Sequence, residues 1–167
     1  KPLTLLAICN SYVFDWCLRL MVGANINLFI MDNTPIPLLL ECARTFCLHC
    51  AVRLLSVHIG YAPLWKEQLG DIWRELTPPF TWPVLAGNVA RWAVRAAIDA
   101  VVAQAYGLNR EQYAYVLSTF SHKSYPAAPR LCLDRFATQA GKPLTIRAKQ
   151  LYHDREEITV FATPARH

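Results

Sequence analysis

The strongest candidate for metal chemistry is a cluster of thiols and an imidazole in one short stretch. Cys47, His49 and Cys50 lie within four positions, and Cys42 precedes them by five. Thiolate sulfur and imidazole nitrogen are the usual ligands of structural zinc, which needs four of them around one point, commonly as two separated pairs. The second pair is missing here, and the stretch has the composition of an apolar helix. We therefore expect core cysteines and no metal ligand, and we keep a small zinc-binding module as a third, weaker hypothesis.

Motifs of nucleophilic, phosphate-binding or metal-dependent catalysis are absent from the sequence. It contains no Gly-rich phosphate loop, no Gly-x-Ser-x-Gly elbow and no His-Glu-x-x-His helix. Glu156 and Glu157 are adjacent rather than facing, which is typical of a solvated pair. We therefore predict no catalytic residue.

The aromatic residues allow a second kind of chemistry, stacking on nucleic-acid bases. The candidates are Tyr61, Trp65, Trp73, Trp82 and Trp92. Aromatic side chains at helical spacing more often fill a core or a helix–helix contact. We expect the packing role for these five residues.

Composition limits the classes of protein that the chain can represent. Of 167 residues, 54% are hydrophobic and 17% charged, which excludes a disordered chain and predicts a packed core. The apolar surplus and the absence of an initiator Met predict a fragment of a longer protein whose surface is partly covered. Polar residues interrupt every long apolar stretch, so we expect no membrane span. Cysteines without the spacing of a disulfide scaffold predict reduced thiols and a cytoplasmic location.

Charge is concentrated at one end of the chain. Residues 121–167 contain eight Lys and Arg against four Asp and Glu, whereas the rest of the chain is close to neutral. A basic segment on a neutral body is typical of a protein that binds a polyanion. A solvated terminal extension has the same composition.

Hydrophobic periodicity predicts a mainly α (α+β) protein, a helical bundle with a few short strands and an irregular basic C-terminal tail. We expect helices over 3–21, 38–55, 66–76, 86–106 and 110–120, with Gly107 after the fourth and Asn109 capping the fifth. Short strands are expected over 26–31 and 144–147. The expected organisation is a helix-rich, target-recognition-like part (1–76), a Pro-rich linker (77–85), a helical segment (86–120) and a basic tail (121–167).

One block of sequence resembles a known family. Residues 10–19 (NSYVFDWCLR), 22–29 (VGANINLF) and 35–37 (PIP) are similar to the C-terminal target-recognition region of large bacterial adenine-specific DNA methyltransferases. These are the Type IIG restriction–modification enzymes and the methyltransferases of BREX-like phage-defence systems. Residues 60–65, 97–100, 105–108 and 115–120 follow in the order found in that family. The resemblance covers about residues 5–135.

The resemblance implies a non-catalytic piece that recognises double-stranded DNA and supports an upstream methyltransferase domain of the same protein. The family's catalytic Asn-Pro-Pro-Tyr is absent from this chain, so S-adenosylmethionine is implied for the parent protein and no cofactor for the piece itself. Whether the chain forms part of an enzyme therefore depends on whether the parent protein is a methyltransferase. The residues then expected to contact DNA are Arg19, Asn25, Asn27, Lys142, Arg147 and Lys149.

Each of these roles has a simpler alternative. Arg19 stands four positions after Asp15, the spacing of an ion pair on one helix. Asn25 has the residue type of an ordinary turn. For the whole chain, the alternative is a helical protein–protein interaction module that does not contact DNA, which the apolar composition and neutral middle also favour.

Overall fold

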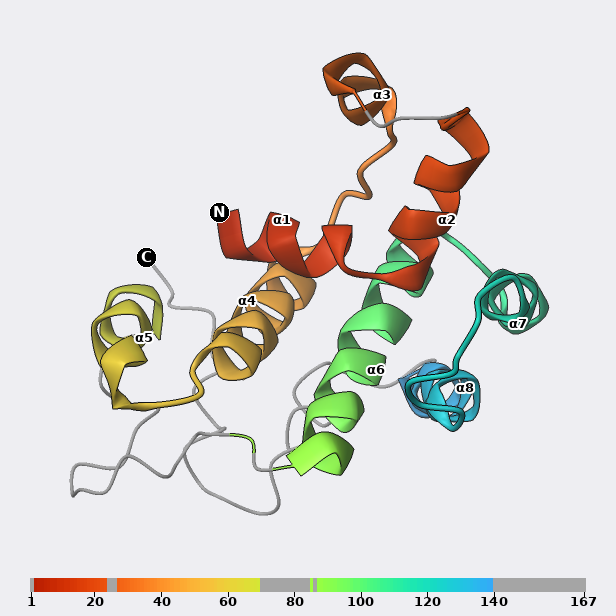
Figure 1. Ribbon diagram of the computed structural model, residues 1–167. Coiled ribbons are helices and arrows are strands. Elements are labelled where there is room, and N and C mark those ends of the chain that lie inside the picture. The colour runs from red at the N-terminus through yellow and green to blue at the C-terminus, as the bar shows by residue number, and fades with distance from the viewer. Residues whose placement is uncertain (1, 24–26, 70–84, 86, 140–167) are drawn as a thin grey trace.

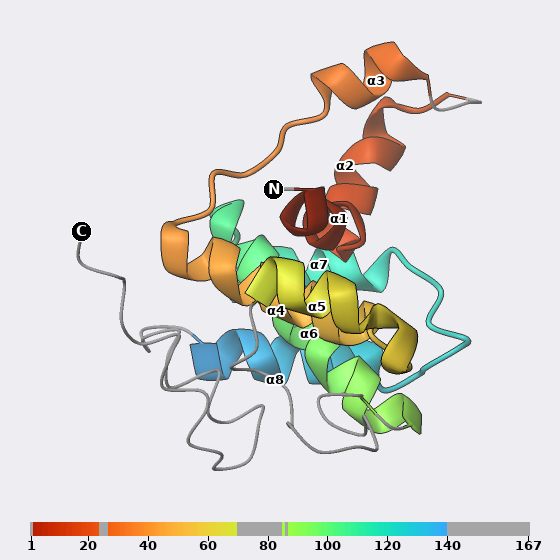
Figure 2. The same ribbon diagram turned by 90° about the vertical axis from the view of Figure 1, so that its left-hand side faces the viewer.

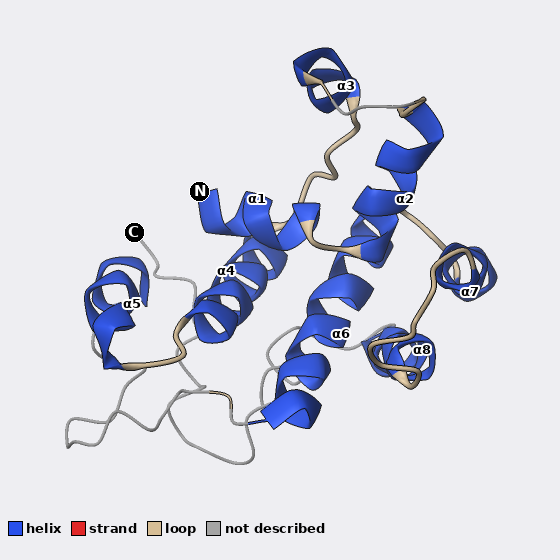
Figure 3. Ribbon diagram, viewed as in Figure 1, coloured by secondary structure: helices blue, strands red, loops and turns tan. Residues whose placement is uncertain are grey.

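The computed structural model of the chain describes residues 2–23, 27–69, 85 and 87–139 (Figure 1). All regular elements in these ranges are helical, which confirms the expected mainly α bundle (Figure 3). In chain order they are α1 (Pro2–Cys9), α2 (Tyr12–Met21), α3 (Leu28–Asn33), α4 (Glu41–Leu55), the 3-10 turn η1 (Ile59–Tyr61), α5 (Ala62–Leu69), α6 (Gly87–Ala105), α7 (Arg110–Ser118) and α8 (Ala128–Gln139).

Helix α6 is the centre of the bundle because it is apolar on two sides. On one side Ala97, Val101 and Val102 join a core cluster with residues of α1, α2, α4 and α5. On the other side Ala96 and Ala100 belong to a second cluster with residues of α7 and α8. The small alanine side chains let α8 pack closely along α6. The views in Figures 1 and 2 agree that α6 lies between α4 and the α7–α8 pair.

The single helix that we expected over residues 3–21 is wrong, because the chain breaks at Asn10 and Ser11. Ser11 is the N-cap of α2, and its hydroxyl accepts a hydrogen bond from the Phe14 N–H at 3.2 Å. The same hydroxyl donates to the Ile8 carbonyl at 2.7 Å. One side chain therefore both ends α1 and begins α2, and the two helices meet at 71°.

The strand expected over residues 26–31 is also wrong, since Leu28–Asn33 forms helix α3. The side chain of Asn27 caps this helix by accepting from the Ile30 N–H at 3.0 Å. Figure 2 shows α3 standing away from the bundle, with an extended stretch leading back to α4. The hydroxyl of Tyr106 donates to the Pro35 carbonyl in that stretch at 2.6 Å and ties it to the end of α6.

Three other expected helices are confirmed close to their expected bounds, namely α4, α6 and α7. Gly107 follows α6 with φ +75°, a conformation that glycine adopts without steric cost. Asn109 and Gln112 form a reciprocal capping box at the start of α7. Helix α5 begins earlier than expected, and residues 70–84, with most of the linker, lie outside the described residues.

The first part of the tail is not irregular, because helix α8 covers Ala128–Gln139. Pro129 occupies the first turn of this helix, where the missing N–H of proline costs no intrahelical hydrogen bond. Phe136 and Cys132 are buried against α6 and α7. The strand expected over 144–147 lies outside the described residues.

In the described part of the chain, none of the helices alone has the length and apolar composition needed to cross a membrane. The α1–α2 pair reaches that composition only when its two bent halves are taken together.

Candidate functional site

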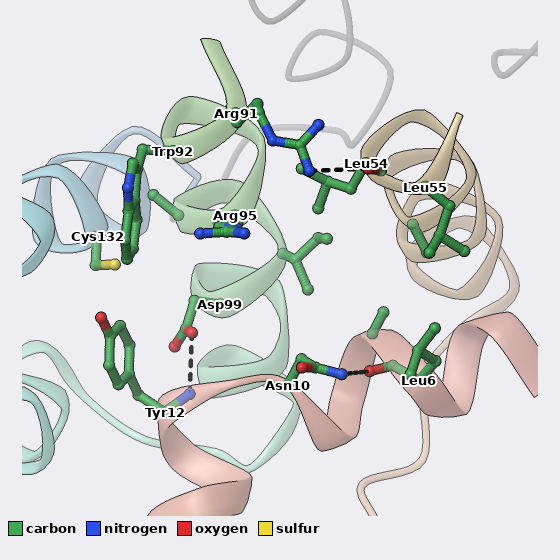
Figure 4. A pocket seen from close by; sticks show the side chains of 14 residues that line it. Leu6, Asn10, Tyr12, Leu54, Leu55, Arg91, Trp92, Arg95, Asp99 and Cys132 are labelled. Carbon is green, nitrogen blue, oxygen red and sulfur yellow. Dashed lines mark hydrogen bonds between the residues drawn. The ribbon is translucent and has the colours of Figure 1, made fainter. Parts of the chain in front are cut away.

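A cavity of about 540 Å³ lies beside α6, where α1, the start of α2, α4 and α8 approach it (Figure 4). We call it the α6 cavity. Its apolar wall comes mainly from α1, α4 and α6. Its polar groups are Asn10, Tyr12, Arg91, Arg95 and Asp99, and Trp92 and Cys132 complete one side.

Asp99 is the most constrained ionisable group of the cavity, with its side chain only 5% exposed. Its Oδ2 accepts a hydrogen bond from the Tyr12 N–H at 3.0 Å, and its Oδ1 accepts one from the Tyr113 hydroxyl at 3.0 Å. Burial raises the pKa of Asp99 to about 7, although both hydrogen bonds act to lower it. Asp99 therefore keeps its proton at pH values where an exposed aspartate has already lost it.

Tyr12 connects the cavity to the α7–α8 side of the bundle. Its hydroxyl lies 3.3 Å from Nδ1 of His122, whose Nε2 lies 2.8 Å from the Leu117 carbonyl. A carbonyl oxygen only accepts, so Nε2 of His122 donates this hydrogen bond. Burial raises the pKa of Tyr12 to about 12, so its hydroxyl remains protonated at neutral pH.

Two arginines stand one helical turn apart on α6 and both line the cavity (Figure 4). Nη2 of Arg91 donates to the Leu54 carbonyl in the last turn of α4 at 3.0 Å. The guanidinium of Arg95 lies over the Trp92 ring, 5.0 Å from its centroid, and Trp92 stacks on Tyr125 at 4.8 Å. These contacts hold both cations at the cavity. Two cations beside an apolar wall are suited to binding a ligand. Asp99 has a different role, because its carboxyl joins α6 to α2 and α7.

Of the six residues expected to contact DNA, the structure describes only Arg19 and Asn27. Arg19 makes the alternative ion pair with Asp15, through Nη2 to Oδ2 at 2.9 Å, and its guanidinium also covers the Phe120 ring at 4.5 Å. Asn27 is the cap of α3. Asn25, Lys142, Arg147 and Lys149 lie outside the described residues. Neither Arg19 nor Asn27 lines the α6 cavity, which sequence reasoning missed.

The expectation of core cysteines is confirmed for Cys47 and Cys50, which are fully buried in α4, whereas Cys42 is exposed. Burial raises the pKa of the Cys47 thiol. His49 is also fully buried and meets the Trp65 ring edge-on at 5.8 Å. Across the residues with a described position, no group of three His, Cys, Asp or Glu side chains could hold a metal ion.

The expected packing role of the aromatic residues is confirmed for Trp65, while Trp92 and Tyr61 make ring contacts within the chain. Trp65 is fully buried in the core, and Trp92 stacks on Tyr125. Tyr61 contacts the His58 ring at 4.8 Å. Trp73 and Trp82 lie outside the described residues.

Part of the chain is similar to bacterial ribosomal RNA methyltransferases. Over 37 residues, 22% of the chain, it is 78% identical to the ribosomal RNA large subunit methyltransferase M of Stenotrophomonas maltophilia strain K279a. It is 79% identical over 34 residues to the protein of that name from Xylella fastidiosa strain M12, and 79% identical over 33 residues to that of Xanthomonas campestris pv. campestris strain B100. The matched stretch spans about a tenth of each relative's length. No family model matches the chain. No solved structure matches it either.

These relatives overturn the resemblance to DNA methyltransferases. The proteins that the chain matches are named as methyltransferases of ribosomal RNA and not as restriction–modification or phage-defence enzymes. We expected double-stranded DNA as the partner because of that resemblance, and this expectation is also wrong. Local structure gives a physical reason, because polar residues of the resembling block have structural roles. Asn10 donates to the Leu6 carbonyl at 2.8 Å, Ser11 caps α2 and Asn27 caps α3.

Proposed function

We propose that the chain is a non-catalytic, helical accessory part of a bacterial protein related to the ribosomal RNA large subunit methyltransferases, and that it binds RNA. The 78% identity over 37 residues carries this proposal. Methyl transfer, with S-adenosylmethionine as the donor, would then take place elsewhere in the parent protein. A ribosomal RNA substrate implies a cytoplasmic location.

The basic end of the chain is the proposed RNA contact. Lys and Arg outnumber Asp and Glu by eight to four over residues 121–167. In the described part of that segment, Lys123 and Arg130 are exposed. Cations near a phosphate backbone release its condensed counterions on binding, which makes the affinity fall with salt. We assign Lys142, Arg147 and Lys149 to this contact with RNA.

The test is binding of the full chain to a fluorescent hairpin of large-subunit ribosomal RNA, measured by anisotropy between about 50 and 200 mM salt. We expect affinity to fall steeply with salt, and the triple variant K142A/R147A/K149A to bind more weakly with a shallower salt dependence. A matched control, R44A/K66A/R110A, removes the same charge from exposed positions on α4, α5 and α7. Absence of binding at low salt, or equal losses in the two triple variants, would contradict the proposal.

The non-catalytic part of the proposal has its own measurement. The purified chain is incubated with radiolabelled S-adenosylmethionine and the same RNA hairpin. We expect no label in the RNA above a protein-free blank. Incorporation that saturates with RNA would place a methyltransferase centre in this chain.

A second candidate function, protein–protein interaction, is favoured by the apolar surface of α3 and the stretch that follows it. Leu28, Phe29 and Leu38 are 81%, 74% and 97% exposed. Asp32 is the only charged residue over 28–40, so this face is complementary to a second copy of itself. Sedimentation should then show self-association that F29D abolishes, whereas Y115D, at an exposed position on α7, should not change it. A monomer at all concentrations would exclude this function for the isolated chain.

A further inference from the structure

The two arginines of the α6 cavity carry two positive charges and make no ion pair with a described residue. Arg91 uses one of its donors on the Leu54 carbonyl, and the guanidinium of Arg95 lies over the ring of Trp92 without an ion pair to any described residue. A guanidinium has five N–H donors in a planar fork, which suits the two oxygens of a carboxylate. Both side chains line the cavity. Among the positions the structure describes, the ion pairs are Arg19 with Asp15 and Arg44 with Glu41, both on other helices.

Asp99, which stands one turn after Arg95 on the same helix, can offset at most one of the two positive charges. Both of its oxygens already accept hydrogen bonds, from the Tyr12 N–H and from the Tyr113 hydroxyl. No ion pair joins Asp99 to Arg95 within 4 Å in the described chain. The carboxyl is thus directed at α2 and α7, and the cavity wall keeps a positive excess.

The remaining wall of the cavity is apolar. Leu6, Leu54, Leu55 and Ile98 line it, and alanines of α1, α4 and α6 leave room between them. A volume of about 540 Å³ falls in the range of small-molecule sites, which combine an apolar wall with a few polar groups that orient the ligand. A ligand that is complementary to both the apolar wall and the two arginines has an apolar body and one anionic group.

We propose that the α6 cavity binds a small organic anion, with Arg95 and Arg91 holding its anionic group and the leucines of α1 and α4 enclosing its apolar body. This binding goes beyond the proposed RNA contact and does not depend on it. Arg95 provides the more adaptable contact, because Arg91 is also tied to the end of α4. The anionic group is a carboxylate or a phosphate monoester, since the same guanidinium fork suits both.

The experiment is a titration of the ¹⁵N-labelled full chain with three probes of one shape, followed by NMR. The probes are 2-naphthoate, 2-naphthyl phosphate and the neutral 2-naphthalenemethanol. We expect an anionic probe to shift the amide signals of residues around Asn10 and Asp99, and to bind at least about tenfold more tightly than the alcohol. Tighter binding of the phosphate than of the naphthoate would support the proposal and identify a phosphate ester as the ligand class.

Substitutions show whether Arg95 is the residue that binds the anionic group of the probe. R95Q should weaken binding of the anionic probe by about tenfold and leave the alcohol unchanged, whereas R95K should recover part of the loss. R110Q, at an exposed position on α7 away from the cavity, should bind like the original chain. Arg95 is itself exposed, so R95Q should fold, and its far-ultraviolet circular dichroism should match that of R110Q. Equal binding of acid and alcohol, no effect of R95Q, or no saturation at millimolar concentrations would overturn the proposal.

Discussion

The backbone N–H of Tyr12 donates a hydrogen bond to Oδ2 of Asp99 at 3.0 Å, across 87 positions of sequence. Tyr12 is the first residue of α2, where the N–H has no partner within its own helix. The other oxygen of Asp99 accepts from Tyr113 on α7. One buried carboxyl on α6 therefore fixes the start of α2 and the middle of α7.

Removing this carboxyl should destabilise the bundle. We expect D99A to lower the free energy of unfolding by about 2–4 kcal/mol, because it leaves the buried Tyr113 hydroxyl and the half-buried Tyr12 N–H without their acceptor and opens a small void. D99N keeps an acceptor oxygen and should lose less than D99A. Urea unfolding followed by circular dichroism measures both variants. An alanine variant within about 0.5 kcal/mol of the original chain would contradict the joining role of Asp99.

The raised pKa of Asp99 also predicts a dependence of stability on pH. The folded chain holds the proton of Asp99 up to about pH 7, whereas the unfolded chain releases it near pH 4. The unfolded state thus binds fewer protons between these values, so the contribution of Asp99 to stability is fully present below pH 4 and is lost as pH rises to 7. The loss amounts to roughly 3–5 kcal/mol over the window.

The matched variant for this measurement is D99N, which has no carboxyl to titrate. We expect D99N to gain stability relative to the original chain as pH rises from 4 to 7, and the difference to remain constant above that. Other groups titrate in both proteins, so their contributions cancel in the comparison. Parallel stability curves for the two proteins would show that Asp99 titrates normally in the folded chain.

His49 should produce the opposite dependence. Burial lowers the pKa of His49 well below its usual value, and the nearby Arg53 cation lowers it further. Below about pH 6.5, His49 becomes protonated in the unfolded chain but stays neutral in the folded chain. The free energy of unfolding therefore falls by up to about 1.4 kcal/mol for each pH unit of acidification. H49Q should remove this part of the acid sensitivity, whatever its effect on stability at pH 7. Thermal unfolding between pH 5 and 7 compares the slopes, and equal slopes would refute the assignment.

Local signals explain which helices the sequence could predict. Helices α6 and α7 form as expected because their signals come from residues close in sequence. These signals are the periodicity of α6, the glycine that follows it and the Asn109 cap of α7. The same kind of signal was present but misread at α3. Its apolar run has the composition of a strand, whereas Asn27 as an N-cap indicated a helix. The tail that we expected to be irregular begins with helix α8, whose first turn contains Pro129 and tolerates proline there.

The candidate site was beyond such reasoning because its members meet only through packing. Asn10 and Tyr12 reach the α6 cavity through the bend between α1 and α2, which depends on the two hydrogen bonds of Ser11. Arg91 and Arg95 are recognisable as neighbours on one helix face from their spacing. Nothing in the sequence indicates that this face turns toward the end of α4.

The turn between α6 and α7 gives a last prediction, from the left-handed backbone of Gly107. At φ +75° a Cβ is strained whatever space surrounds it, and no heavy atom lies within 4 Å of the place that a Cβ would take. We expect G107A to lower the free energy of unfolding by about 1 kcal/mol, and G107N to lose less because asparagine tolerates this conformation.

Gly23 provides the matched control, since its surroundings are equally open and its φ lies outside the left-handed region. G23A should therefore be neutral or slightly stabilising, through the reduced freedom of the unfolded chain. Equal effects of G107A and G23A in urea unfolding would mean that the loss comes from solvent exposure and not from backbone strain.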